Sequence, residues 1–523
     1  MDTITLTFDD YVKPDHEIVV GIFYAWLYDK YGVAKVAIDY DADIAQIPEC
    51  LHFPSKIEFE GRDYFVKLIG NKKTPQKVRE VYVPEGVLIL DDSFNGFYCL
   101  EKIHLPSTLE SIESYSFHEC DSLSSIDIPT SVERIGFGAF SNSGITKINI
   151  PRSVKVFSEC MFHTCKKLEE VVFEGDLEVL KSRTFMDCES LVRVKLPENL
   201  ISFEGECFRG CSSLEKIIIP GRVKKLSRFL FYNCQCLTEV IFPEKINYFG
   251  ESCFEGCKSL KHIEIPSGVL EIGMRAFKDT AIESLYIPED VEQLGYGITN
   301  GCNQLTSIVV SPDNLSFTSG DNYNAVFDRN MTVLITGCKT TTIPPTVKTI
   351  YHFAFSCLDF ETIELPEGVE SLGMFLFSEC PKLKEISLPD TAHQVSESCF
   401  YKCENLNKVR LPLVMDSIKR ALFEGCRSLK EVIMPESCQY MEEGAFRGCE
   451  SLYNIQLPKN LYELGREAFA GCESLTKVEL PEGLQSIGPG AFLNCINLEE
   501  AVVPPSVGNL YKNTFKGCKK LKK

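Results

Sequence analysis

A phenylalanine that returns every 22 or 23 residues is the feature of this sequence that most restricts its fold. The first series comprises Phe94, Phe117, Phe140, Phe162, Phe185, Phe208, Phe231, Phe254 and Phe277, and the second comprises Phe355, Phe377, Phe400, Phe423, Phe446, Phe469, Phe492 and Phe515. A fixed period in this range is typical of stacked supersecondary units, each of which contacts only its neighbours. We therefore predict a solenoid with one elongated core.

Each repeat follows the pattern L-x-x-I-x-I-P-x-x-V-x-x-I-G-x-x-A-F-x-x-C. Because strand side chains alternate between faces, Ile263 and Ile265 are predicted to point inward and Glu264 outward. Pro266 ends the strand, since it has no N–H to donate to a ladder. Phe277 then fills the widest part of the core from a short helical or 3₁₀ turn. The fold prediction is mostly β, with one parallel strand per coil.

Residues 1–80 do not follow the repeat, and we predict a small β-rich N-terminal cap that shields the first coil. Branched and aromatic residues favour strands at Thr3–Phe8, Val33–Ile38 and Ile57–Phe59. The E-G-R-D sequence that follows the third run predicts a hairpin into Tyr64–Leu68. The stretch Glu17–Tyr28 is compatible with either an amphipathic helix or a strand.

Regular coils are predicted over residues 81–311 and 344–523, separated by an irregular coil at 312–343. That coil contains two apolar runs, Ala325–Phe327 and Thr332–Ile335, with the turn residues D-R-N-M between them. We predict a hairpin that stands off the coil. It is either a functional protrusion or a simple insertion.

The 24 cysteines recur with the repeat and do not resemble a secreted disulfide framework. The recurrent positions are Cys120, Cys165, Cys188, Cys211, Cys234, Cys257, Cys380, Cys403, Cys426, Cys449, Cys472, Cys495 and Cys518, with Cys302 one place out of step. Phe97, Ser143 and Thr280 occupy the same place in other coils, so it does not require a bond or a metal. Buried free thiols are the main interpretation; structural disulfides and metal ligation are the alternatives.

Charge and hydropathy limit the partners. A formal charge of −20 opposes phosphate backbones and anionic lipid, so we expect no nucleic-acid partner. No apolar run reaches the ~18–20 residues that cross a membrane, so no membrane insertion is expected. The N-terminus lacks a signal peptide, which predicts a cytoplasmic protein if the chain is complete, and a cell-surface or secreted one if a leader was removed.

No motif for catalysis, cofactor binding or metal binding emerges, so we predict that the protein is not an enzyme and holds no cofactor or metal. His118-Glu119-Cys120 lacks the second histidine of H-E-x-x-H. Asp39 and Asp41 imitate the start of a calcium loop with Asp43, but the later ligand positions do not fit. Phosphate-binding glycine loops and nucleophile elbows are also missing from the sequence.

The repeat resembles the BspA-type subclass of the leucine-rich repeat superfamily. The resemblance lies in L-x-x-I-x-I-P, in I-G before the corner and in A-F-x-x-C-x-S-L leading to the next coil, over roughly residues 81–521. It implies a right-handed, curved leucine-rich-repeat solenoid, a horseshoe or superhelix with the parallel sheet on the concave face. Family members are mostly binding or adhesion proteins of bacterial and protist surfaces.

The outward residues of the predicted strands form a row along the coils, and the middle of this row is unusually apolar. Its apolar members are Val172, Ile218, Ile241, Tyr286 and Val309. Exposed apolar clusters often mark interaction sites, whereas ordinary strand propensity is the alternative explanation. We predict a non-catalytic scaffold that presents this row to a protein or glycan ligand. The alternative is a structural protein that self-associates, edge to edge, through an open C-terminal coil; otherwise we expect a monomer.

Overall fold

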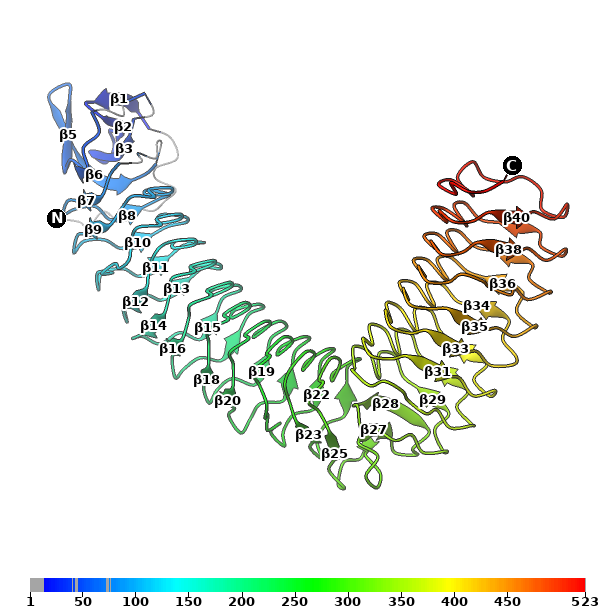
Figure 1. Cartoon of the computed structure of the whole chain (residues 1–523). Coiled ribbons are helices and arrows are strands. Elements are labelled where there is room, and N and C mark those ends of the chain that lie inside the picture. The colour runs from blue at the N-terminus through cyan, green and yellow to red at the C-terminus, as the bar shows by residue number, and fades with distance from the viewer. Residues whose placement is uncertain (1–13, 40, 43–45, 72–74, 76, 523) are drawn as a thin grey trace. The chain divides into compact units, whose positions relative to one another are not determined.

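The computed structural model describes residues 14–39, 41, 42, 46–71, 75 and 77–522 of the 523-residue chain. The chain divides into two compact units, Met1–Leu260 and Lys261–Lys523, and each is described here by itself. All regular elements of the described residues are β-strands. Figure 1 shows that each unit consists of successive coils stacked edge to edge.

Residues 145–165 illustrate how the sequence builds one coil. In β12 (Lys147–Ile150), Ile148 and Ile150 are buried whereas the residues that alternate with them are exposed, as predicted for a half-buried strand. Pro151 follows at once, and the N–H of Val154 donates to its carbonyl at 3.1 Å to close a turn. The chain then forms a second, two-residue strand before reaching the buried Phe162. Each coil therefore has two strand positions and one phenylalanine turn.

The first strand position forms the long-strand ladder, in which groups of two or three neighbouring coils pair in parallel and in register. In the first unit it comprises β4 (Cys50–His52), β7 (Glu80–Tyr82), β9 (Lys102–His104), β12, β14 (Glu170–Phe173), β16 (Arg193–Lys195), β18 (Lys216–Ile218) and β20 (Glu239–Ile241). In the second unit it comprises β23 (Ser284–Ile287), β25 (Ser307–Val310), β31 (Glu385–Ser387), β33 (Lys408–Arg410), β35 (Glu431–Ile433), β38 (Lys477–Glu479) and β40 (Glu500–Val502). In the coil that contains Ile263 and Ile265 the second isoleucine is buried and Glu264 is exposed, but no strand forms.

The second strand position forms the short-strand ladder, which the sequence pattern did not predict. In the first unit it comprises β8 (Ile89–Leu90), β10 (Ser111–Ile112), β11 (Arg134–Ile135), β13 (Val156–Phe157), β15 (Val179–Leu180), β17 (Ser202–Phe203), β19 (Lys225–Leu226) and β21 (Tyr248–Phe249). In the second unit it comprises β22 (Glu271–Ile272), β24 (Gln293–Leu294), β29 (Thr349–Ile350), β30 (Ser371–Leu372), β32 (Gln394–Val395), β34 (Ser417–Ile418), β36 (Tyr440–Met441), β37 (Glu463–Leu464) and β39 (Ser486–Ile487). Two residues are too few to show a side-chain period.

The phenylalanine turns are not helical, so the predicted helical or 3₁₀ turn is wrong for the described residues. The reason is a left-handed residue on each side of the phenylalanine: Cys160 has φ 59° and Thr164 has φ 61° around Phe162. A residue in the left-handed region cannot continue a right-handed helix. Instead, the N–H groups of these three residues all donate to carbonyls of the next coil, at 3.0, 2.7 and 2.9 Å respectively.

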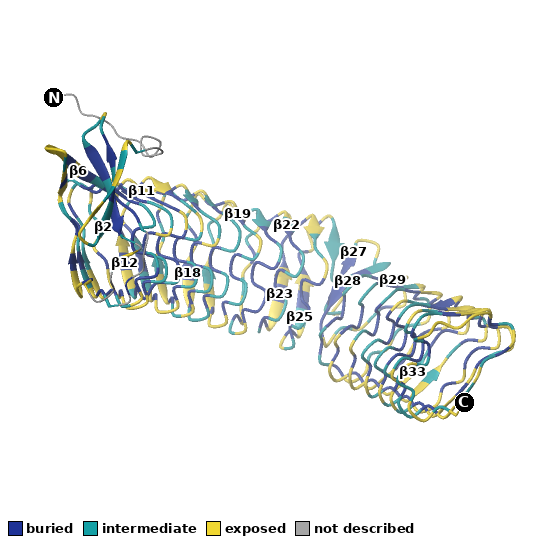
Figure 2. Ribbon diagram, turned by 90° about the horizontal axis from the view of Figure 1, so that it is seen from above, coloured by how far each residue is buried: buried dark blue, intermediate teal, exposed yellow. Residues whose placement is uncertain are grey.

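The repeat phenylalanines form the centre of the core, as predicted. Those of both units up to Phe492 are fully buried, and Phe515 is partly buried. Rings of neighbouring coils stack nearly parallel, with centroids 5.6 Å apart between Phe162 and Phe185 and 5.1 Å apart between Phe423 and Phe446. In Figure 2 the buried residues follow the interior of the coils and the exposed residues follow their outer turns.

The cysteines are all free, which agrees with the buried-thiol interpretation. Most of the repeat cysteines are buried, and each thiol donates to the carbonyl of the phenylalanine in the preceding coil, as Cys188 does to Phe162 at 3.0 Å. The same carbonyl accepts the N–H of Cys165, three residues along its own coil, at 3.0 Å. Cys302 makes the equivalent bond to the Phe277 carbonyl at 3.0 Å. It therefore belongs to the same row of thiols, the thiol ladder, although it is one place out of step in the sequence.

The N-terminal strands continue the short-strand ladder. Val33–Ile38 forms β3 as predicted, and it pairs in parallel with β6 (Arg62–Ile69), which itself pairs with β8. The predicted hairpin joins β5 (Lys56–Phe59) to β6, with Glu60 and Gly61 at φ 51° and 78°, as a tight I′ turn requires. The predicted strand Thr3–Phe8 lies outside the described residues.

The stretch that was compatible with helix or strand is two strands. They are β1 (His16–Val20) and β2 (Phe23–Tyr28), which pair antiparallel. Gly21, at φ 62°, makes the reversal between them, and this left-handed residue excludes one continuous helix.

The predicted hairpin of the irregular coil exists, but it does not stand off the coil. Its strands β27 (Ala325–Asp328) and β28 (Val333–Gly337) pair antiparallel and follow β26 (Phe317–Thr318) in a six-stranded sheet. The second strand pairs in parallel with β29, so it takes the place of a short strand. Phe327 and Leu334 are fully buried. Burial of these apolar side chains holds the hairpin within the stack.

Candidate binding site on the strand face

The strand face is the outward side of the long-strand ladder, and all five residues predicted for the ligand site lie on it. Ile218 and Ile241 are 60% and 40% exposed, Tyr286 and Val309 are 49% and 45% exposed, and Val172 is half-buried. Val172, Ile218 and Ile241 belong to the first unit; Tyr286 and Val309 belong to the second.

The five residues form two separate groups, one on each unit. Ile218 and Ile241 are register partners across β18 and β20, and Tyr286 is opposite Val309 across β23 and β25. Val172 is opposite Lys195 across β14 and β16. Apolar residues that are adjacent across a ladder have their Cβ atoms close together, so each pair forms a continuous apolar surface.

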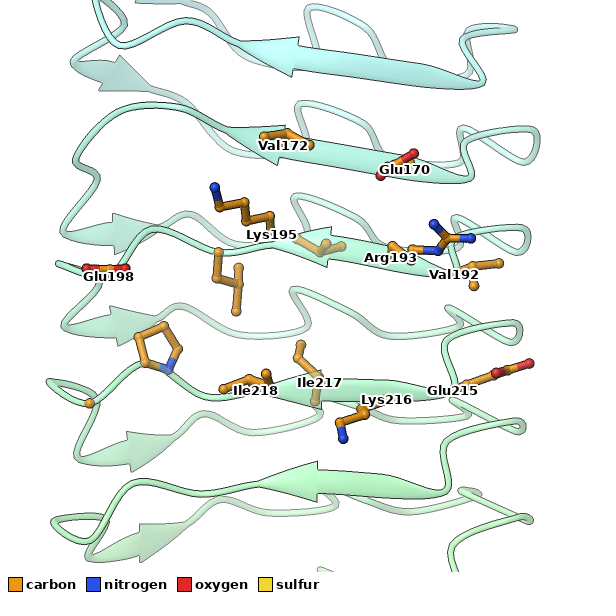
Figure 3. Close-up of a pocket in the computed structure, with 14 residues that line it drawn as sticks. Glu170, Val172, Val192, Arg193, Lys195, Glu198, Glu215, Lys216, Ile217 and Ile218 are labelled. Atoms are coloured by element: carbon orange, nitrogen blue, oxygen red, sulfur yellow. The ribbon is translucent and has the colours of Figure 1, made fainter.

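A cleft of about 650 Å³ opens on the strand face of the first unit, and two of the predicted residues, Val172 and Ile218, line it. It lies along β16 and β18, and Val192, Val194, Ile217 and Pro220 contribute most of the remaining apolar lining. Figure 3 shows Val172, Lys195 and Ile218 one below another on three successive strands. Ile241 does not line this cleft.

The cleft exists because the long-strand ladder is interrupted between β16 and β18, which belong to different sheets. On the N-terminal side, the N–H groups of Val192 and Arg193 both donate to the carbonyl of Glu169, at 3.0 and 3.1 Å. The equivalent groups one coil later, those of Glu215 and Lys216, make no such bond to Val192 within the described chain. The backbones of the two coils are therefore separated on this side.

The interruption exposes part of the core. Val171 and Phe173 of β14 are buried, but Val194 and Leu196, the equivalent residues one coil later, are only half-buried. Because the two coils do not close over them, their side chains are accessible from the strand face. An apolar side chain of a ligand placed there would be removed from water against this opening.

The charged residues around the cleft differ in their pairing. Glu170 pairs with Lys147 at 3.5 Å and Lys216 pairs with Glu239 at 2.8 Å. Arg193 and Lys195 make no side-chain hydrogen bond or ion pair within the described part of the chain. They are the outward residues of a single strand, R-V-K; the same pattern recurs as K-V-R in β33 (Lys408–Arg410), which pairs on both sides, so the sequence alone does not locate the cleft.

The strand face changes character in the first coils, where aromatic and titratable residues replace the aliphatic ones. His52, Tyr82 and His104 are register partners whose rings stack, with centroids 4.4 and 4.0 Å apart. Glu80 contacts His104 Nε2 at 2.8 Å, and this contact lowers the pKa of the Glu80 carboxyl. These side chains satisfy one another, so the apolar surface does not extend into these coils.

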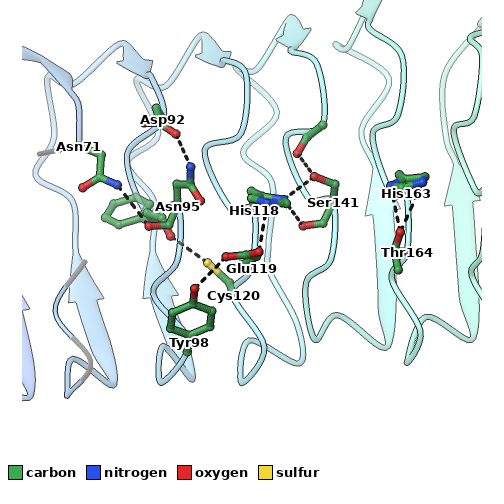
Figure 4. A network of polar contacts seen from close by, with 12 residues as sticks. Asn71, Asp92, Asn95, Tyr98, His118, Glu119, Cys120, Ser141, His163 and Thr164 are labelled. Carbon is green, nitrogen blue, oxygen red and sulfur yellow. Dashed lines mark hydrogen bonds and ion pairs between the residues drawn. The ribbon is translucent and has the colours of Figure 1, made fainter. Parts of the chain in front are cut away.

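Figure 4 shows a polar network at the phenylalanine turns of the first unit. Asn95 donates to Asp92 at 2.8 Å, and a ring nitrogen of His118 lies 2.7 Å from Ser141 Oγ in the next coil. Cys120 donates its thiol to a backbone carbonyl, and burial raises its pKa well above the ordinary thiol range. A thiol held in its neutral form is a poor nucleophile, and the contacts of Cys120 and His118 join neighbouring coils.

The described residues contain no cluster of three or more histidine, cysteine, aspartate or glutamate side chains arranged to hold a metal ion. Of the three aspartates that imitate a calcium loop, Asp43 lies outside the described residues. A membrane-crossing helix is also not found in the described part of the chain.

Parallel strands in register, a proline stop after the strand and a repeated core residue define a leucine-rich-repeat solenoid. The BspA type leucine rich repeat region model matches residues 88–208, 178–306, 335–452 and 393–522, and the chain belongs to this family. Leucine-rich repeat proteins of this kind are generally non-catalytic scaffolds for protein interaction.

Solved structures similar to this chain include leucine-rich repeat proteins of bacteria. One from Bacteroides ovatus is 23% identical, covering 92% of this chain and 94% of that chain with a TM-score of 0.35. A leucine rich cell surface protein from Faecalibacterium prausnitzii is 18% identical, covering 98% and 94% with a TM-score of 0.34. The leucine-rich repeat protein of T. pallidum is 24% identical over 47% of this chain and 91% of that chain, with a TM-score of 0.25. A search of curated proteins found no match.

Proposed function

We propose that the protein is a binding scaffold whose strand face holds a protein ligand. The observation that carries this proposal is the cleft beside Ile218, where the interrupted ladder leaves Val194 and Leu196 accessible. Rigid coils present such a surface without the cost of ordering it on binding. Adhesion to another cell is the setting that the family resemblance implies.

The lining favours a protein over a glycan. The middle of the cleft is formed by Val172, Val194, Ile217 and Ile218, which offer no hydrogen-bonding group from their side chains. Apolar side chains of a protein can be buried against these residues, whereas the hydrogen-bonding groups that a sugar needs come only from the charged residues around them.

The test is capture of ligand by the purified full-length chain, in comparison with an Ile218→Asp/Ile241→Asp variant. Extract from neighbouring or host cells supplies the ligand, and circular dichroism checks that the variant is folded. We expect the variant to lose capture, because a charge at each position removes the apolar contact. Tyr286→Asp tests the second unit in the same way.

The matched control is a Lys155→Glu/Lys224→Glu variant, which changes two exposed residues that immediately precede short strands. It should retain capture. Full binding by all three aspartate substitutions would remove the strand face from consideration.

A further inference from the structure

A second pocket lies on the strand face of the second unit, between the irregular coil and the coil that follows it. Its volume is about 450 Å³, which is within the range of small-molecule sites. Residues 338–344 and 361–366 occupy the long-strand position of these two coils, and neither segment forms a strand. Each segment ends in a proline, Pro344 or Pro366, so their residues can be matched by position. We call this site the irregular-coil pocket.

The irregular-coil pocket has an apolar part. Ile343, Ile363 and Leu365 line it and are only half-buried. Ile386 and Leu388, which are equivalent to Ile363 and Leu365 in the next coil, are buried. The core is therefore accessible between the two coils, and C–H groups of a ligand can be removed from water there.

The pocket also has polar groups that find no partner within the described chain. Thr342 and Glu364 are each the second residue before the proline, a position that faces outward in the regular strands, and Thr362 lies two residues before Glu364. All three are exposed, and their side chains make no hydrogen bond or ion pair among the described residues. The neighbouring Glu361, in contrast, pairs with Lys384 at 2.8 Å. Two hydroxyl groups and one carboxylate are therefore available to a ligand.

A neutral sugar matches this combination of groups. A sugar ring has C–H groups on its faces and hydroxyl groups around its edge; the hydroxyl groups can donate to Glu364 and both donate to and accept from Thr342 and Thr362. Lys339 also lines the pocket, but its ammonium group already donates to the Asn303 carbonyl at 2.5 Å. An acidic sugar would meet Glu364 on a chain whose net charge is −20.

We infer that the irregular-coil pocket binds a neutral sugar unit of a glycan. One face of the sugar ring lies against Ile343, Ile363 and Leu365, and its hydroxyl groups bond to Glu364 and Thr362. The pocket belongs to the second unit and the β16–β18 cleft to the first, so this second site does not depend on the proposed function. Bonds to the carboxylate provide affinity, and the apolar part selects the face of the ring.

Saturation-transfer difference NMR with the full-length chain tests the inference. The probes are three neutral trisaccharides (mannotriose, galactotriose and maltotriose) and the acidic trigalacturonate. We expect saturation transfer to one or more of the neutral probes and none to trigalacturonate. Glu364→Gln should raise the Kd of the neutral probe by about tenfold, because an amide cannot make the charge-assisted bonds of a carboxylate.

The matched control is Glu264→Gln, the same change at an exposed residue that also lies two places before a proline, in a coil outside the pocket. It should alter the Kd less than about twofold. Ile218→Asp/Ile241→Asp, which changes the first unit, should bind the neutral probe as the unaltered chain does.

A measurement on the unaltered chain covers the case in which a variant does not fold. Carbodiimide coupling of an amine to Glu364, followed by mass spectrometry, should slow when the neutral probe is bound, whereas coupling to Glu264 should not. Binding of none of the neutral probes, equal binding of trigalacturonate, an unchanged Kd in Glu364→Gln or unprotected Glu364 would each overturn the inference. If no neutral probe binds and Glu364→Gln weakens the capture of protein, the pocket is part of a protein-binding surface and the sugar assignment is wrong.

Discussion

Within the first unit, the phenylalanine turns and the strand face differ in how continuously their coils are joined. At the turns, each phenylalanine N–H donates to the next coil from Phe94 to Phe231, and the rings stack without a break. On the strand face, the ladder is interrupted twice, between β9 and β12, where the intervening coil forms no strand, and between β16 and β18. The turns therefore supply the stability of the stack, and this permits the strand face to open without unfolding the coils.

The largest difference between the two regions should appear in the free energy of unfolding. Phe446→Ala or Phe254→Ala should cost about 3–5 kcal/mol, because each removes a fully buried ring and leaves a cavity. Ile218→Ala, at an exposed position of the strand face, should change it by less than about 0.5 kcal/mol. Urea unfolding measures both, and equal losses would contradict the division of roles.

Alkaline pH should weaken the turns through their thiols. Burial raises the pKa of Cys165 to about 11 and that of Cys302 to about 12, above the ordinary value of about 8.5. The unfolded chain therefore loses these protons first. The stabilisation is complete below about pH 8.5 and falls above it, by about 1.4 kcal/mol per pH unit for each buried thiol.

Urea unfolding at about pH 8 and about pH 10, which lie below and above the ordinary thiol pKa of about 8.5, measures this loss of stability. A Cys211→Ala/Cys234→Ala variant is the control, because it lacks two of the buried thiols and should show a shallower decline. Parallel declines for the two proteins would show that thiol ionisation is not the cause.

A single thiol should have a smaller effect. Cys211 donates to the Phe185 carbonyl at 3.1 Å, and that carbonyl keeps its bond from Cys188 N–H when the thiol is removed. Cys211→Ala should therefore cost about 1–2 kcal/mol, from a small cavity and one lost hydrogen bond. Cys236→Ala, at an exposed cysteine, should be nearly neutral in the same assay; a similar cost for both would contradict a role for the thiol ladder.

The smallest effect is expected for the ion pairs of the strand face. Lys216 and Glu239 are 2.8 Å apart, but both side chains are about half exposed. Lys216→Ala should therefore reduce the free energy of unfolding by less than about 0.5 kcal/mol. If Lys216→Ala reduced the free energy of unfolding as much as Phe446→Ala, the strand face would contribute to stability, and this would contradict the division of roles.

The features predicted correctly from the sequence are those that depend on side-chain period. The spacing of the phenylalanines and the alternation around residues such as Asn149 predict what is buried, and both are observed. The short strands were missed because two residues carry no alternation. The left-handed residues of the turns were missed because types as different as Cys160, Thr164 and Arg183 adopt the same φ.

The candidate site was only partly predictable for a similar reason. An exposed Ile218 follows from the pattern of its strand. The cleft depends on backbone hydrogen bonds that fail to form between two coils, and the V-x-L and I-x-I of those coils keep the same alternation of inward residues as the V-x-F of the coils on either side. The ligand assignment at Val172, Ile218, Ile241, Tyr286 and Val309 stays a prediction, as does self-association through the C-terminal coil.

Native-state hydrogen exchange of the free protein tests the central claim most directly. If the turns join the first unit continuously and the strand face is open between β16 and β18, the amides of Phe185 and Phe208 exchange slowly, and those of Lys216 and Ile218 exchange rapidly. Equal protection of the two sets would contradict the account, because it would show a closed ladder where the cleft is described.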